Sequence, residues 1–189
     1  CIVSVAALGK PELRAKLLMN PYRVEKHKEY YRFVTSGFVH GSYMHLGFNM
    51  FTFYFFGEAI EGLLGPTLFI ILFISGIIIS DIPSFLKYKN APHYNSLGAS
   101  GGVSSILFAS ILYQPMTELM IFPIPIPIKG FILGILYLIY SYYSGKQSKD
   151  NINHDAHLFG ALYGLLFAFI ANPDLAQQGI QAVLNWRPF

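Results

Sequence analysis

The stretch from residue 67 to residue 85 constrains this chain most, because it is the most apolar segment of the sequence. Between residues 70 and 79, only Ser75 and Gly76 interrupt the apolar run. A helix of about 20 apolar residues spans a bilayer core of roughly 30 Å. Charged residues make up 12% of the chain, about half of the usual share of about 25%, and the mean hydropathy is +0.45. We therefore expect an integral membrane protein and not a soluble domain.

Four more segments have the composition of membrane helices, and they cover residues 45–64, 98–113, 131–143 and 156–172. Gly65-Pro66 divides the first of these from the apolar run that follows, since proline is tolerated in a first helical turn. The run Ile2–Leu8 would rise only about 12 Å as a helix, so we interpret it as the end of a truncated first span. The sequence thus predicts an all-α integral membrane protein, a polytopic helix bundle with five full spans plus a truncated first helix.

Two of the remaining segments have distinctive compositions. Residues 98–113 are short and rich in glycine and serine, so we expect a central helix that other helices surround. Pro123, Pro125 and Pro127 alternate with isoleucine. This pattern predicts an extended interfacial loop, because each proline removes a backbone donor and clashes with the preceding turn.

The chain divides on this pattern into four parts. Residues 1–8 form the end of the truncated helix, residues 9–43 an interfacial first loop, residues 44–172 the helix bundle, and residues 173–189 a tail with a short amphipathic helix at 174–186. Most basic residues lie between Lys10 and Arg32, among three glutamates, which is typical of a headgroup-facing loop and argues against a nucleic-acid partner. The single cysteine, Cys1, excludes an internal disulfide.

The motif Gly98-Ala99-Ser100-Gly101 places a serine between small residues at the expected start of the short central helix. Such a serine can have an uncrowded Oγ and a nearby backbone amide, as a nucleophile requires. Small residues around a serine are also typical of closely packed membrane helices. This motif alone therefore does not distinguish catalysis from packing.

A second motif is Ala156-His157-Leu158-Phe159-Gly160, with Gly164 one turn further on. Gly160 and Gly164 share one helix face, in the small-residue pattern that lets two membrane helices approach closely. Ser100 and Ser104 offer a similar face on the short helix, and docking of the two faces would bring Ser100 Oγ to His157. An imidazole that takes the hydroxyl proton makes serine nucleophilic near neutral pH, and an ionisable side chain inside a membrane is a functional candidate.

His40, His45 and Asn49 precede these two motifs in the chain. His45 and Asn49 are four residues apart and share a face near the start of the 45–64 helix, where both can donate hydrogen bonds. With the Ser100 backbone amide they could hold the negative oxygen that forms in acyl transfer, and each such donor is worth about 100- to 1000-fold in rate. His40 comes before the helix, and we interpret it as a loop anchor.

The order His-x4-His-x3-Asn, Gly-x-Ser-Gly and Ala-His-x2-Gly, on separate spans, resembles the pattern of the rhomboid family of intramembrane serine proteases. The resemblance covers residues 20–172 and includes Tyr31-Arg32 and the glutamate Glu61 near a helix end. It implies a catalytic dyad of Ser100 and His157, with an oxyanion site formed by His45, Asn49 and the Ser100 amide. It also implies structural roles for His40, Arg32, Glu61, Gly98, Gly101, Gly160 and Gly164.

By the same resemblance, the substrates are single-span membrane proteins that are cut in or near their membrane segment, and the lipid bilayer is the other partner. The resemblance implies no cofactor, no metal and no nucleic acid. The brevity of the chain favours a bacterial plasma membrane, with the active site opening to the outer face. Residues 144–153 would act as a flexible cap over the site.

Two features depart from the family pattern. Some bacterial members have a tyrosine four residues after the nucleophile, stacked on the catalytic histidine, whereas Ser104 occupies that position here, so the support of His157 is left unassigned. The segments expected to face outward are 9–43, 86–97 and 144–153. They hold eleven lysines and arginines against two in the inward segments, which is opposite to the positive-inside expectation.

Three other functions fit part of the sequence. A metal protease could use His154, Asp155 and His157, with further nitrogen from His40 or His45, but the motif His-Glu-x-x-His is absent. A catalytically silent rhomboid-like protein that binds membrane clients would be expected to have lost the serine or the histidine. A transporter would show inverted repeats and paired carboxylates, and here Asp81 stands near the end of its span, where we expect an interfacial location.

Overall fold

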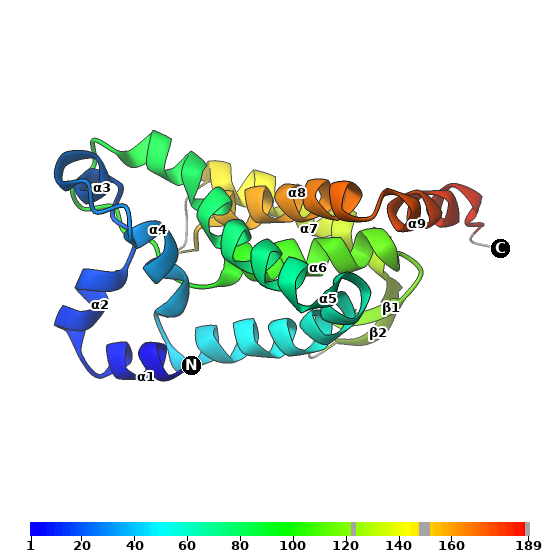
Figure 1. The fold of residues 1–189 in the computed structure, drawn as a ribbon, viewed down its shortest axis with the longest axis horizontal. Helices are drawn as coiled ribbons and strands as arrows, with labels where there is room; N and C mark the ends of the chain where they lie inside the picture. The colour runs from blue at the N-terminus through cyan, green and yellow to red at the C-terminus, as the bar shows by residue number, and fades with distance from the viewer. Residues whose placement is uncertain (122–123, 148–151, 188–189) are drawn as a thin grey trace.

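The structure is a computed structural model that describes residues 1–121, 124–147 and 152–187. It is mostly helical, and Figure 1 shows its arrangement. The elements in chain order are α1 (Ile2–Leu8), α2 (Pro11–Leu17), α3 (Pro21–His27), α4 (Arg32–Thr35), the 3-10 helix η1 (Ser36–Phe38), α5 (Tyr43–Tyr88), α6 (Ser100–Tyr113), β1 (Glu118–Ile121), β2 (Ile124–Lys129), α7 (Gly130–Gln147), α8 (His154–Ala171) and α9 (Pro173–Asn185).

Polar caps define where several of these helices begin. Asn20, Ser42, Asn153 and Asn172 each accept a backbone N–H from the first turn of the helix that follows, and such caps satisfy donors that the helix cannot pair itself. Proline occupies the first position of α3 and α9, where its missing N–H removes no helical bond.

The long helix α5 consists of two arms joined at a sharp bend. Gly65 has φ 77° and ψ 162°, a conformation that glycine adopts at no steric cost, and Pro66 begins the second arm. The two arms form a helical hairpin that runs out and back (Figure 1). The predicted break at Gly65-Pro66 is therefore present in the structure.

Two of the described helices, α5 and α8, are long and apolar enough to cross a membrane. The arms of α5 have about 20 residues each, which is the length that a bilayer core requires. In contrast, α6 has only 14 residues. The expected count of five full spans stays a prediction.

The short helix α6 lies in the middle of the bundle, packed against α5 and α8 (Figure 1). Residues 101–106 and 108–111 are buried, so α6 is enclosed on all sides. The C-terminal half of α6 belongs to a core cluster with Ile60 and Leu72 of α5 and Ala168 of α8. The prediction of a central helix agrees with the structure, since a helix that is apolar all round must be covered by its neighbours.

The all-α expectation is incomplete between α6 and α7, where β1 and β2 form an antiparallel hairpin with Glu118 opposite Lys129. Residues 124–129, which include Pro125 and Pro127, are extended, as predicted, and pair with the residues of β1. Pro123 lies outside the described residues. Lys129 Nζ lies 2.8 Å from Glu118 Oε1 across the hairpin. An extended segment forms a strand only where a second segment lies beside it. The alternating prolines predict extended backbone but do not show that residues 118–121 pair with it.

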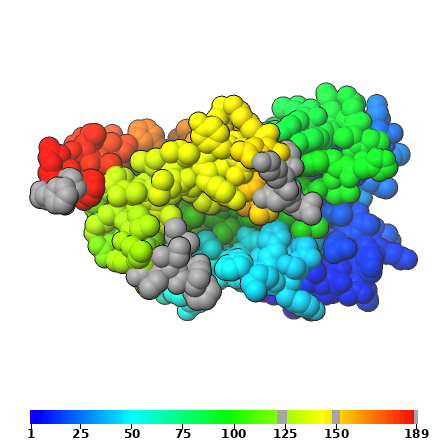
Figure 2. All heavy atoms as spheres, turned by 180° about the vertical axis from the view of Figure 1, so that it is seen from behind, coloured from blue at the N-terminus to red at the C-terminus, as the bar shows by residue number. Residues whose placement is uncertain are grey.

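The molecule is elongated, with α1–α4 at one end, α9 at the other and α7 along the face seen in Figure 2. The predicted amphipathic tail is present as α9, which packs against α6 and α8. Of the expected cap, residues 144–147 belong to α7, and residues 148–151 lie outside the described part. α1 ends at residue 8, α5 begins at residue 43 and α8 ends at residue 171, next to the expected boundaries. The division into four parts stays a prediction.

Candidate active site

Ser100 is the first residue of α6, and the turn before it is unusual. Gly98 has φ +116°, a value that residues with a side chain rarely adopt, and a Cβ there would lie 2.6 Å from Cε1 of His45. Ser100 is half-buried. Because it opens the helix, its backbone N–H has no partner within the helix and lies at the positive end of the helix dipole.

Glycines let α6 and α8 meet backbone to backbone. A Cβ on Gly160 would lie 2.3 Å from the carbonyl oxygen of Gly101, and one on Gly164 would lie 2.2 Å from the carbonyl oxygen of Ser105. Ser105 Oγ is 2.9 Å from the carbonyl oxygens of both Gly101 and Gly160. We call this contact the glycine seam.

The expected docking of α6 on α8 through Ser100 and Ser104 is wrong in its register. The face that meets Gly160 and Gly164 carries Gly101 and Ser105, one position further along α6. The physical reason is size, since Gly101 has no side-chain atom at the point of closest approach to Gly160, whereas Ser100 would place a hydroxymethyl group there. The two helices run parallel, so Ser100 and His157 lie at the same end of the seam, and both are half-buried.

A small cavity lies next to Ser100, and Ser80, Asp81, Asn153 and Ala156 are among the residues that line it. Asp81 was expected at the membrane interface, but it is buried and accepts a hydrogen bond from Ser36 Oγ over 3.2 Å. The cavity therefore brings a carboxyl group, several hydroxyls and the proposed nucleophile together between α5, α6 and α8.

The ring of Tyr137, on α7, stacks on the ring of His157 with centroids 6.3 Å apart and planes 22° apart. The Tyr137 hydroxyl lies 2.8 Å from Ser104 Oγ. The sequence left the support of His157 unassigned, and this contact supplies a neighbour for its ring from a third helix. No signal in the sequence pointed to Tyr137, because α7 contains several tyrosines and only the packing of three helices distinguishes this one.

The first loop meets the turn before Ser100 through two histidines. His40 is buried, and its Nε2 accepts the backbone N–H of Ala99 over 3.3 Å. His45 packs against His40 with ring centroids 4.9 Å apart and against Gly98. Asn49 is buried one turn further along α5 and donates one amide hydrogen to the carbonyl of His45 over 3.0 Å, so the second hydrogen of its amide remains for another acceptor.

Burial, and after it the nearby His45, lowers the pKa of His40 to about 4. His40 is therefore neutral near pH 7, as its acceptor role toward Ala99 requires. A neutral imidazole can accept through one nitrogen while it donates through the other.

Arg32 holds the first loop together and is 2% exposed. Its guanidinium donates to the carbonyls of Ala15 and Leu18 over 3.0 and 2.6 Å, which caps the end of α2, and to Glu29 Oε2 over 2.5 Å. The hydrogen bond from Arg23 and then that from Arg32 lower the pKa of Glu29 to about 2. We call this set of contacts the arginine clamp.

Glu61 is exposed on α5, and no ionic partner for it is found among the described residues. Its structural role stays a prediction.

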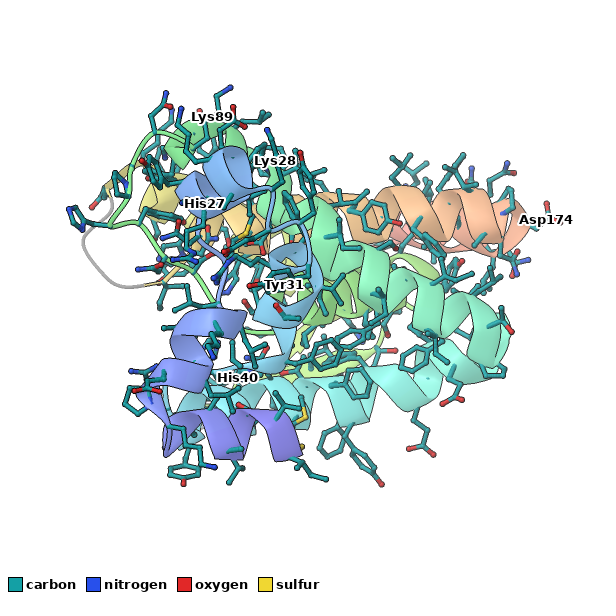
Figure 3. The ribbon with its side chains drawn as sticks, turned by 60° about the vertical axis from the view of Figure 1, so that its left-hand side comes forward. His27, Lys28, Tyr31, His40, Lys89 and Asp174 are labelled. Carbon is teal, nitrogen blue, oxygen red and sulfur yellow. The ribbon has the colours of Figure 1, made fainter. Side chains whose placement is uncertain are left out.

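Among residues 1–121, 124–147 and 152–187, no three His, Cys, Asp or Glu side chains group as a metal site would require. Lys28 and Lys89 lie at the same end as Tyr31, and Asp174 lies at the opposite end (Figure 3).

The chain is similar in sequence to known proteins. The family model described as Rhomboid domain matches residues 27–173. The chain is 24% identical over 159 residues to Rhomboid protein 1, mitochondrial, of Saccharomyces cerevisiae, a match that covers 81% of this chain and 46% of that protein. It is 30% identical over 150 residues to Presenilin-associated rhomboid-like protein A, mitochondrial, of Danio rerio, covering 71% and 36%. It is 28% identical over 159 residues to Rhomboid-like protein 11, chloroplastic, of Arabidopsis thaliana, covering 75% and 52%.

This chain spans about half or less of the length of these relatives. Their names refer to mitochondria and chloroplasts, and they give no support to a bacterial plasma membrane. The family model, in contrast, covers most of the chain and includes every motif from His40 to Gly164. With its apolar composition and its helical bundle, the chain is a membrane protein that belongs to the rhomboid family.

Proposed function

We propose that this protein is an intramembrane serine endopeptidase that hydrolyses peptide bonds in or near the membrane segments of single-span proteins. The observation that carries the proposal is the glycine seam. It sets Ser100 and His157 at the same end of two parallel helices, half-buried among apolar segments. Family membership supports a protease of this kind, and the residue roles below are our assignment.

In the first step, Ser100 Oγ attacks the carbonyl carbon of the scissile bond while His157 takes the hydroxyl proton. The C–N bond then breaks, and His157 returns that proton to the leaving amine, which leaves an ester on Ser100. In the second step, a water molecule gives a proton to His157 and attacks the ester, and Ser100 regains its proton as the acid product leaves. This is the acid–base cycle of serine hydrolases, with two residues in place of three.

The carbonyl oxygen becomes negative in both steps, and we assign its donors to the first residue of α6 and to two residues near the start of α5. The Ser100 backbone N–H is one, at the positive end of the α6 dipole. The remaining amide hydrogen of Asn49 and the imidazole of His45, which borders Gly98, are the others. Removal of one such donor costs about 100- to 1000-fold in kcat.

Tyr137 supports the His157 ring in this scheme. We infer that the ring contact, with centroids 6.3 Å apart, restricts rotation of the imidazole and so keeps one of its nitrogens directed toward Ser100. Ser104 holds the Tyr137 hydroxyl and so takes part in orienting the base without contacting it.

We infer that the site opens where the first loop and the turn before Ser100 meet. Lys28 and Lys89 lie at the end of the molecule opposite to Asp174 (Figure 3). We assign the protein to a membrane and infer that this end faces the compartment from which water reaches Ser100.

Labelling with a fluorophosphonate probe tests the function most directly. We expect the probe to modify Ser100, as mapped by mass spectrometry of the digested protein, and to leave His157→Ala unlabelled although it folds. Cleavage of a membrane-anchored reporter by Ser100→Ala would contradict the assignment. A folded wild-type protein that neither labels nor cleaves would instead indicate the silent, client-binding alternative.

A further inference from the structure

A line of three buried groups connects α1 to the residue before Ser100. Ser4 Oγ lies 3.0 Å from His40 Nδ1, and the Ala99 backbone N–H donates to His40 Nε2 over 3.3 Å. Ser4, His40 and Ala99 are only 1%, 2% and 1% exposed. His40 lies close to α1 in Figure 3. Both ring nitrogens of His40 are therefore engaged, out of contact with solvent.

The Ala99 amide decides which nitrogen of His40 carries the hydrogen. A backbone N–H can only donate, so Nε2 must be the unprotonated nitrogen. A neutral imidazole then carries its hydrogen on Nδ1 and donates it to Ser4 Oγ. Ser4 is thus the acceptor that stabilises the one tautomer able to bind Ala99.

The Ala99 amide matters because it fixes the peptide plane one residue before the nucleophile. The N–H of Gly98 donates to the carbonyl of Ser36 over 3.0 Å, so the first loop binds two successive amides of this turn. Ala99 has φ −73° and ψ −1°, and the direction of the Ser100 N–H follows from the plane that His40 holds. Oxyanion donors are effective because they are preorganised, so a tilt of this plane weakens the Ser100 donor.

We propose that Ser4 of α1 is a positioning residue for the reaction, acting through His40 and Ala99 on the Ser100 amide. The inference rests on the proposed peptidase function and extends it to a helix that contributes no group to the reacting atoms. A role in packing alone would require only the shapes of Ser4 and His40, whereas this role requires the hydrogen on Nδ1.

The first test needs no catalysis. Nitrogen-15 NMR of the protein with labelled histidine, in detergent micelles, reports the protonation of each ring nitrogen, and the His40 signal is the one lost in His40→Gln. We expect hydrogen on Nδ1 in the wild type and a shift toward the other tautomer in Ser4→Ala. A wild-type signal with hydrogen on Nε2, or a Ser4→Ala spectrum identical to the wild type, would overturn the proposal.

The second test is kinetic. We expect Ser4→Ala to lower kcat by roughly five- to tenfold, the factor that one hydrogen bond supports, with KM unchanged. The matched control is Ser75→Ala, which removes a hydroxyl bound to Tyr163 across α5 and α8 at 2.6 Å, and we expect it to leave kcat unchanged. Equal kcat losses in both variants, or none in Ser4→Ala, would remove the positioning role.

Ser100→Ala separates the two ways of failing. If Ser100→Ala still cleaves the reporter, the proposed function itself has failed. If Ser100→Ala is inactive while Ser4→Ala has the kcat of the wild type, only the role of Ser4 is lost.

Discussion

The glycine seam and the arginine clamp both fix the surroundings of Ser100, but they use opposite chemistry. At the seam, α6 and α8 touch through backbone atoms at Gly101 and Gly160, with hardly any side chain between them. In the clamp, the long side chain of Arg32 reaches the end of α2 and binds two carbonyls and a carboxylate. The helices at the seam approach closely because glycines leave no side-chain atoms between them. The clamp is held by one large side chain that makes several hydrogen bonds.

The difference follows from the surroundings of each region. Between helices in lipid there is little hydrophobic driving force, so close packing and small residues bring helices together. The first loop has polar backbone groups that no helix pairs, and a buried guanidinium with several donors satisfies them. The seam therefore cannot accept an added atom, whereas the clamp cannot lose a donor.

The largest effect is expected from an added methyl group at the seam. In Gly160→Ala, the new Cβ would lie 2.3 Å from the Gly101 carbonyl oxygen, so the helices must separate, at a cost of roughly 3 kcal/mol of unfolding free energy. Ser100 and His157 would move apart, and reporter cleavage should fall below detection. Thermal unfolding in micelles and the cleavage assay measure the two effects.

The control for this variant is Gly62→Ala, because a Cβ at Gly62 meets no atom within 4 Å. The same change there should leave cleavage intact and raise stability by up to about 1 kcal/mol, since alanine favours helices over glycine. A Gly160→Ala protein as stable and active as Gly62→Ala would show that the seam is not a close contact.

The stability of the arginine clamp should depend on its hydrogen-bond donors, so the variant to test is one that removes them. Arg32→Leu removes the donors to Ala15 and Leu18 and should cost roughly 2 kcal/mol, in the range for hydrogen bonds to charged groups. Arg23→Leu is the matched control, because the Arg23 side chain is half exposed and, in the described part of the chain, its one ion pair is with Glu29. Exposed pairs contribute under about 1 kcal/mol. Chemical unfolding, and the rate of proteolysis within residues 9–42, compare the stability of the two variants. Equal losses of unfolding free energy in Arg32→Leu and Arg23→Leu would refute the clamp.

The sequence predicted the elements better than their contacts. The Gly65-Pro66 break, the short α6 and the amphipathic α9 follow from local patterns, because proline, glycine and helical periodicity act within a few residues. The predicted register of α6 against α8 was wrong by one position, because Gly101 and Ser105 make the contact. Small residues at both 100 and 101 fit the pattern, and only close packing of whole helices selects Gly101.

The sequence also did not predict contacts between residues that are far apart in the chain. Asp81 resembles an interfacial residue in the sequence, and its burial beside Ser36 depends on how the first loop folds over α5. The stack of Tyr137 on His157 joins α7 to α8, with Ser104 of α6 at the hydroxyl. Such a three-helix contact leaves no periodic signal, so a single sequence does not reveal it.

A smaller effect is expected where a side chain supports the proposed base. Tyr137→Leu removes the ring from His157, and kcat should fall about tenfold, which is the upper range for an aromatic pair. Tyr137→Phe keeps the ring and loses only the bond to Ser104, so it should retain most of the kcat, with KM unchanged in both. Tyr143→Leu, at an exposed position of the same helix, is the control. Identical losses in the Phe and Leu variants would exclude the stack as the cause.

The smallest effect concerns the acidic member of the clamp, and it depends on pH. Hydrogen bonds from Arg23 and Arg32 lower the pKa of Glu29 to about 2, against about 4.3 in an unfolded chain. Glu29 therefore stabilises the folded state fully above that unfolded value, and the contribution is lost as the pH falls toward 2. Glu29→Gln should be slightly less stable than the wild type at pH 7, by under about 1 kcal/mol.

Unfolding of the two proteins at pH 7, 4 and 2.5 measures this dependence, and their difference should shrink at each step. Glu25 lies four residues before Glu29 and makes no ion pair among the described residues, so Glu25→Gln should show no such convergence. A difference between Glu29→Gln and the wild type that persists at pH 2.5 would mean that the shape of the glutamate, and not its charge, holds the loop. The clamp would then resemble the seam more closely than its chemistry indicates, since both would depend on fit and not on ionisation.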